Sequence, residues 1–142
     1  MAEGILNHLG AKRFQAFSAG SFPSGEVHPL SLVTLQQHGM TAQGYRSKSW
    51  DEFQDQPIDL VITVCDNAAH ETCPIFPGAP IKAHWGAPDP AHFRGTAVEI
   101  AAEFERVFGI LERRVNALLA LSLDAMDAQE TARQLQAIGR II

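Results

Sequence analysis

Two cysteines lie eight residues apart where the unusual residues of this sequence concentrate. Cys65 and Cys73 enclose the sequence CDNAAHETCP. If the loop between them folds back, the two sulfur atoms can approach the ~2 Å of a disulfide, and a thiol pair that cycles between dithiol and disulfide is the chemistry of a reductase. The alternative interpretation makes Cys65 a small buried strand residue and Cys73 an incidental loop thiol. The residues alone leave both interpretations open.

A metal site is a further interpretation of the same region. Cys65, His70, Cys73 and His84 together offer four ligands. Structural zinc sites usually contain more closely spaced cysteine pairs, which disfavours this interpretation. Isolated loop histidines are more often solvated than catalytic, so we assign no role to His70, His84 or His92.

A carboxylate occupies a rigid turn a little further along the chain. Asp89 lies between Pro88 and Pro90, just after a segment that we expect to form a strand. Proline fixes the backbone on both sides, so the carboxylate could be held at the mouth of a sheet and donate a proton to a leaving group. A turn or helix-capping aspartate is the simpler alternative, and spacing alone favours it.

The sequence contains no complete oxyanion-binding loop. Such a loop needs a nest of backbone N–H groups, usually with a nucleophile and an arginine. Neither cysteine is followed by an arginine six residues on, because those positions hold Glu71 and Ala79. Glycine-rich phosphate-binding loops of the known patterns are also absent from the sequence.

Length and composition predict one globular domain of 142 residues. A net charge of −5 and a pI near 5.6 argue against nucleic acid and acidic membranes as partners. Two cysteines are too few for a disulfide framework. The sequence starts without a basic segment followed by a long apolar run, and no apolar stretch reaches the length of a membrane span. We therefore predict a cytoplasmic location and no membrane contact.

Helical and strand-like patterns alternate along the chain, which predicts an α/β domain with a mainly parallel sheet and ligands at the carboxyl ends of its strands. Strands are expected over Arg13–Ala19, Ile58–Cys65 and Ile81–Trp85, with Ile58–Cys65 as a central strand buried on both faces. Helices are expected over Ala2–Leu9, from Pro29 to Gly39, over Trp50–Gln54 as one turn, over Thr96–Leu121 and over about Ala128–Ile138.

Several motifs together resemble one family. MAEGILNHLG is followed in order by SAGS, HPL, YRSKS, DLVITVCDNAA, CP and HWGAPDPA. This series is similar to the thioredoxin-coupled arsenate reductases built on the low-molecular-weight tyrosine-phosphatase fold, and it spans nearly the whole chain. The resemblance implies a three-layer α/β/α domain over residues 1–142, with a helical extension over about 124–142.

The resemblance also implies roles for single residues. In that family a cysteine in a Cys-x5-Arg loop attacks arsenate, a second cysteine attacks the covalent intermediate to release arsenite, and a third takes over the disulfide and exposes it to thioredoxin. By motif position Cys65 corresponds to the second cysteine and Cys73 to the third. Asp89 corresponds to the general acid of the family's phosphatases. The implied substrate is arsenate or a phosphate-like oxyanion, thioredoxin is the external reductant, and no bound cofactor is implied.

The sequence departs from the family pattern at its start. Family members carry a strand and the Cys-x5-Arg loop directly before the MAEG helix, and this sequence begins at Met1 without a helix-capping residue. We expect such a chain to be inactive in arsenate reduction. We also expect it to be destabilised, to form homo-oligomers, or to be completed by another segment.

Two other functions stay open. One is a non-catalytic remnant that binds a partner or a soft metal through Cys65 and Cys73. The other is a tyrosine-phosphatase-like phosphatase, which the thiol pair and the HWG sequence before Asp89 disfavour.

Overall fold

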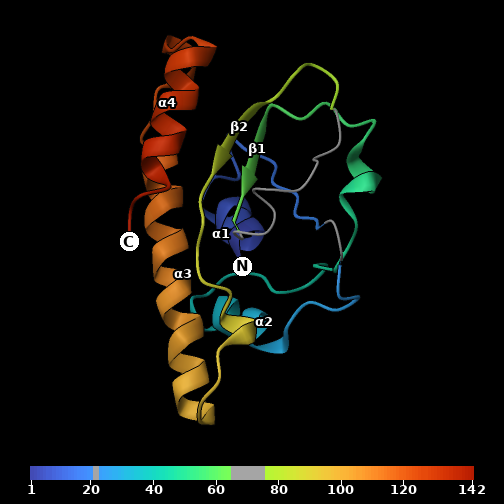
Figure 1. The fold of residues 1–142 in the computed structure, drawn as a ribbon, viewed down its shortest axis with the longest axis vertical. Coiled ribbons are helices and arrows are strands. Elements are labelled where there is room, and N and C mark those ends of the chain that lie inside the picture. Colours follow the sequence, from blue (N-terminus) through green and yellow to red (C-terminus); the bar gives the residue numbers. More distant parts are fainter. Residues whose placement is uncertain (21–22, 65–75) are drawn as a thin grey trace.

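The computed structural model describes residues 1–20, 23–64 and 76–142 (Figure 1). The described residues form four helices and a sheet of two parallel strands, in agreement with the predicted α/β class. In chain order they are α1 (Ala2–Leu9), α2 (Pro29–Gln37), β1 (Leu60–Thr63), β2 (Ile81–His84), α3 (Ala97–Leu119) and α4 (Ala128–Ile138). Short 3-10 turns cover Trp50–Phe53, Pro90–His92 and Leu123–Ala125.

β1 and β2 pair in parallel, from Leu60 opposite Ile81 to Thr63 opposite His84. Both strands were predicted, in slightly longer form. The prediction that β1 is buried on both faces is wrong for its four described residues, which are all half-buried. Among the described residues β1 pairs with a strand along one edge only, so its other edge lacks the cover that a central strand has.

The predicted strand over Arg13–Ala19 is also wrong. The chain turns at residues 11–13 and then has no regular secondary structure until an isolated bridge joins Gly20 to Ser49. The side chain of Asn7 takes the place of a ladder neighbour: its Nδ2 donates to the carbonyl of Ala16 over 3.0 Å, and its Oδ1 accepts from the Ala16 N–H over 2.8 Å. A segment with strand propensity therefore stays outside the sheet, because a strand also requires a paired backbone.

The first apolar core joins α1 and α2 to the part of α3 between Val107 and Val115. Capping residues fix where these helices begin. Thr96 accepts from the N–H of Glu99 over 3.2 Å at the start of α3, and the ring of His28 accepts from the N–H of Leu30 over 3.1 Å at the start of α2. The core side chains are Ile5, Leu35, Met40, Val107, Phe108, Leu111 and Val115.

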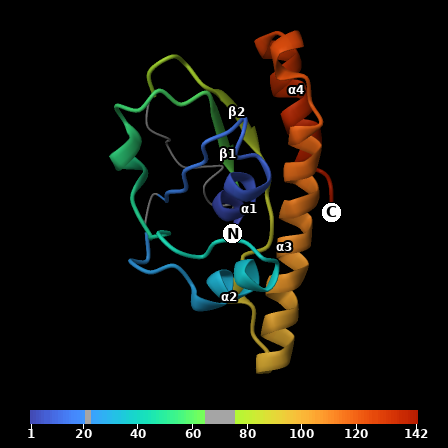
Figure 2. The ribbon, with the colours of Figure 1, turned by 180° about the vertical axis from the view of Figure 1, so that it is seen from behind.

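A second core joins β2, the upper half of α3 and α4. α4 folds back along α3, and both views place these two helices in one column beside the strands (Figures 1 and 2). Arg13 holds the bend that leads to α4, donating to the carbonyls of Leu119 and Leu121 over 2.6 and 3.0 Å. The buried side chains of this core are Ala83, Trp85, Leu118, Leu135 and Ile138. The C-terminal helix is thus part of the packed domain.

Within the three described ranges, no helix combines the length and the apolar composition needed to cross a membrane.

Candidate active site

The carboxyl ends of β1 and β2 are tied together beyond the last sheet residues. The Trp85 N–H donates to the carbonyl of Thr63 over 2.7 Å, and the Ala87 N–H donates to the carbonyl of Val64 over 2.9 Å. The Thr63 hydroxyl and His84 Nδ1 are also hydrogen-bonded, over 2.7 Å. The residue that precedes position 65 therefore lies beside the segment that leads to Asp89, at the edge of the sheet where ligands bind in α/β proteins.

The two cysteines fall on residues 65–75, outside the described part of the chain. The predicted roles of Cys65 and Cys73 remain predictions. Of the four residues in the alternative metal interpretation only His84 is described, and its ring is bonded to Thr63. Among the described residues no group of three or more histidine, cysteine, aspartate or glutamate side chains is arranged to hold a metal ion.

Asp89 presents its carboxylate in a defined position on the surface. Oδ1 accepts from the N–H of Ala91 over 3.0 Å, which caps the 3-10 turn Pro90–His92. Oδ2 lies 3.2 Å from Nδ1 of His92, and 48% of the Asp89 side chain is exposed. The capping role that was the simpler interpretation is therefore present, and the exposed carboxylate can still meet a ligand. The contact with His92 was not predicted. The spacing of three residues between Asp89 and His92 was the sequence feature that pointed to it.

Arg114 and α4 hold Trp85 and Gly86, which lie shortly before Asp89. The indole Nε1 of Trp85 donates to the carbonyl of Leu135 over 2.8 Å, and only 3% of Trp85 is exposed. Arg114, 2% exposed, donates to the carbonyls of Trp85 and Gly86 over 2.7 and 3.2 Å. We did not predict Arg114 from the sequence. Arg114 lies on the apolar stripe of α3, three residues after Leu111. This position among apolar residues indicated that its side chain is buried.

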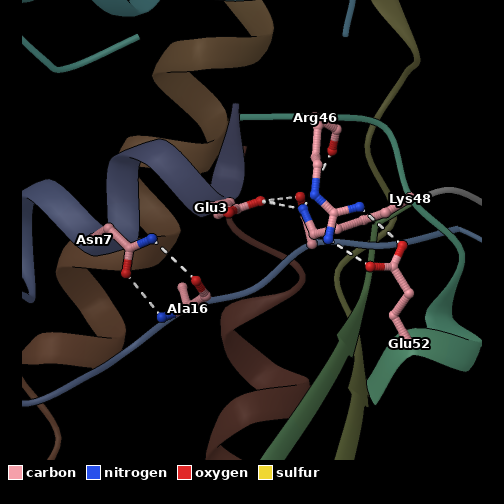
Figure 3. A network of polar contacts seen from close by, with 7 residues as sticks. Glu3, Asn7, Ala16, Arg46, Lys48 and Glu52 are labelled. Carbon is pink, nitrogen blue, oxygen red and sulfur yellow. Dashed lines mark hydrogen bonds and ion pairs between the residues drawn. The ribbon is translucent and has the colours of Figure 1, made fainter. Parts of the chain in front are cut away.

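A polar network holds the beginning of α1 (Figure 3). Glu3 Oε2 accepts from the hydroxyl of Ser18 and lies 3.6 Å from Nζ of Lys48. Both charged side chains are nearly buried, with 13% of Glu3 and 7% of Lys48 exposed. Lys48 also donates to the carbonyl of Arg46 over 3.2 Å. Burial, and secondarily the negative charge of Glu3, raises the pKa of Tyr45. The start of α1 is thus fixed to two later segments.

An exposed ion pair lies beside this network (Figure 3). Arg46 binds Glu52 through two hydrogen bonds of 2.9 and 2.5 Å. The hydrogen bond to Arg46 lowers the pKa of Glu52, and the same bond raises the pKa of Arg46. Because 62% and 42% of these side chains are exposed, solvent screens the pair.

Comparison with known proteins identifies relatives along most of the chain. The family model described as low molecular weight phosphotyrosine protein phosphatase matches residues 1–134. An arsenate reductase of Halalkalibacterium halodurans is 33% identical over 115 residues, which cover 81% of this chain and 81% of the relative. An arsenate reductase of Bacillus subtilis is 33% identical over 107 residues, covering 75% and 76%. A glutaredoxin arsenate reductase of Synechocystis is 29% identical over 120 residues, covering 84% and 86%.

Two solved structures have the same fold. They are an arsenate reductase in the reduced state, with a TM-score of 0.66 and 26% identity, and an arsenate reductase in the phosphate binding state, with a TM-score of 0.62 and 27% identity. Each match covers 84% of this chain and 85% of the other.

Proposed function

Because the chain belongs to the low-molecular-weight phosphotyrosine protein phosphatase family, within its arsenate reductases, we propose that it carries the second half of an arsenate reduction. The observation that supports this most is the match to arsenate reductases over about four-fifths of the chain. The family resemblance of Cys65, Cys73 and Asp89 supports a role for each in the reaction. The proposed substrate is arsenate or a similar tetrahedral oxyanion, and the proposed location is the cytoplasm.

In the proposed mechanism, Cys65 acts on an arsenate that is already bound through sulfur to a nucleophilic cysteine. The Cys65 thiolate attacks that sulfur and forms a disulfide. The electron pair of the sulfur–arsenic bond stays on arsenic, which leaves as arsenite. The thiolate of Cys73 then attacks the sulfur of Cys65, which forms a Cys65–Cys73 disulfide and releases the nucleophilic cysteine. Thioredoxin reduces this disulfide.

Asp89 has the proposed role of proton donor in the step that forms the sulfur–arsenic bond. An oxygen leaves arsenate in that step and needs a proton. The exposed carboxylate on a capped turn at the carboxyl end of the sheet supports this role.

The nucleophilic cysteine and its arginine are not present in the 142 residues, because no cysteine is followed by an arginine six residues on. We therefore propose that this polypeptide alone does not turn over arsenate. An N-terminal strand and Cys-x5-Arg loop, placed before Met1, should provide this nucleophile and should also extend the sheet along the edge of β1 that has no strand partner among the described residues.

The test compares the 142-residue chain with a chain extended by that strand and loop. Arsenate-dependent oxidation of NADPH is followed with thioredoxin and its reductase, and in parallel with glutathione and glutaredoxin. We expect turnover only in the extended chain, and its loss in Cys65→Ser and Cys73→Ser variants of it. Turnover by the 142-residue chain would contradict the proposed inactivity.

A phosphatase is the second candidate, because the family model takes its description from phosphatases. The discriminating measurement is hydrolysis of p-nitrophenyl phosphate by the extended chain. A phosphatase would lose this activity in Asp89→Asn and keep it in Cys65→Ser and Cys73→Ser. An arsenate reductase needs both thiols for arsenate turnover.

A further inference from the structure

Arg114 is a buried cation whose hydrogen bonds go to backbone carbonyls. Nη1 donates to Trp85 and Gly86, and Nε donates to the carbonyl of Ile141 over 2.9 Å. In the described part of the chain no carboxylate lies within ion-pair distance of it. Burial lowers the pKa of Arg114, but a guanidinium stays protonated in proteins. A charge kept in the interior without a counter-charge is costly, so the three carbonyls must be held firmly for it to persist.

The C-terminal helix contacts the same short segment from another direction. The carbonyl of Leu135 accepts from the Trp85 indole, and Oε1 of Gln136 accepts from the N–H of His84 over 3.3 Å. Gly139 lies so close that an added Cβ would be 2.5 Å from the carbonyl oxygen of His84. Residues 84–86 are therefore held by α3 through Arg114 and by α4 through Leu135 and Gln136, and Gly139 packs against them directly after α4.

These contacts with residues 84–86 restrict the position of Asp89. Only two residues separate Gly86 from Asp89, and the first of them, Ala87, is bonded to Val64 at the end of β1. Pro88 and Pro90 then restrict the backbone on both sides of Asp89. Few rotatable bonds remain between the carbonyl that Arg114 holds and the carboxylate, so a change at the first is transmitted to the second.

We propose that Arg114 is a positioning residue for Asp89: by holding the Trp85 and Gly86 carbonyls, and by locking Ile141 beside them, it fixes the turn that presents the carboxylate. This inference deepens the proposed function and rests on it for the role of Asp89. The geometric part can be tested on the 142-residue chain without any activity.

The experiment follows two amide groups by NMR in the 142-residue chain. Hydrogen exchange of the Ala87 N–H reports the junction between the segment and β1. The chemical shift of the Ala91 N–H reports the Asp89 carboxylate that it binds, with Asp89→Ala as the reference for an absent acceptor. The test variant is Arg114→Gln. Its matched control is Arg113→Gln, which removes the same charge from an exposed neighbour on α3.

We expect Ala87 exchange in Arg114→Gln to rise at least about tenfold more than exchange of the α2 amides. The Ala91 shift should move toward its value in Asp89→Ala. Arg114→Lys should give an intermediate result, because an ammonium can serve one carbonyl but lacks the planar fork. Equal acceleration at Ala87 and in α2, with an unmoved Ala91 shift, would mean that Arg114 only adds general stability, and would overturn the proposal.

Arg114→Lys and one further variant keep the test decisive if Arg114→Gln fails to fold. Arg114→Lys keeps the charge, and a chain that ends at residue 140 removes the Ile141 carbonyl while leaving Arg114 in place. We expect both to loosen Ala87 and to shift Ala91 in the same direction, to a smaller extent. If neither variant changes these two amides, the proposal is wrong.

Activity of the extended chain separates this inference from the proposed function. Asp89→Asn and Arg114→Lys should both lower kcat for arsenate more than they change KM, with Arg113→Gln unchanged. If Asp89→Asn has no effect on kcat, the proposed acid role fails while the NMR result stands. If Asp89→Asn lowers kcat and Arg114→Lys does not, the positioning role fails.

Discussion

The nearly buried pair of Glu3 and Lys48 should contribute measurably to stability. We propose to remove each charge with a side chain of similar size, as Glu3→Gln and Lys48→Met, and to combine the two. The carboxylate oxygen and the ammonium nitrogen are 3.6 Å apart. With an effective dielectric constant of roughly 20, Coulomb's law gives an attraction of about 4–5 kcal/mol at that distance.

Desolvation offsets part of this attraction, so the measured coupling should be smaller. We expect a coupling free energy of about 1–3 kcal/mol, in the range found for contacting residues. Lys48→Met alone should cost about 3 kcal/mol, the lower end for a broken buried pair, because the hydroxyl of Ser18 still binds Glu3. The double variant should be less destabilised than the sum of the single variants.

Urea unfolding of the four chains, followed by circular dichroism at neutral pH, gives the four free energies of unfolding. Equal slopes against urea are needed to compare them. The exposed pair of Arg46 and Glu52 is the matched control, with Arg46→Met and Glu52→Gln. Added salt should weaken the exposed pair and leave the buried one nearly unchanged. A coupling at Glu3 and Lys48 no larger than that of the exposed pair would refute the reasoning.

Three other outcomes follow from contacts described above. Tyr45 is the single tyrosine, so absorbance at 295 nm should show it ionising above the usual pKa. Its raised pKa means that its share of stability is complete below pH 10 and is lost as pH rises through the folded-state pKa; Glu3→Gln should lower that pKa. Trp85→Phe should cost about 0.5–1.5 kcal/mol in urea unfolding, because it removes the indole donor of the Leu135 carbonyl, to which the Gly139 N–H still donates over 3.3 Å. Gly139→Ala should destabilise the chain in the same assay, since its methyl would meet a carbonyl oxygen at the end of β2. A shift of Tyr45 to lower pKa, or unchanged unfolding in either variant, would contradict these expectations.

The helices could be predicted closely because their determinants are local. The predicted bounds of the last helix, Ala128–Ile138, match those of α4, where Asp127 accepts from the N–H of Glu130 over 2.7 Å. α3 begins after its capping residue Thr96 in the same way. Apolar periodicity and a capping side chain lie within a few residues of each other in the sequence, so a local pattern contains both.

The strands were harder because a strand depends on a distant partner. Arg13–Ala19 has strand propensity, yet its backbone is met at Ala16 by the side chain of Asn7. Local composition cannot reveal which backbone will lie alongside.

The candidate site was predicted in part. The motif located Asp89 correctly in a turn after β2. The carbonyl groups that anchor this turn to Arg114 are backbone atoms, which every residue has, and so no residue pattern marks them.

The contact between α4 and β2 also bears on how copies of this protein behave at high concentration. A bare edge strand is a template on which another chain can add a strand, and this is a common beginning of aggregation. The N–H of His84 points away from β1 and is occupied by Gln136, while Leu135 and Ile138 cover the apolar face of β2. Displacing α4 would uncover the strand edge and the apolar surface together. The helix that supports the Asp89 turn therefore also protects this edge of the sheet from intermolecular pairing.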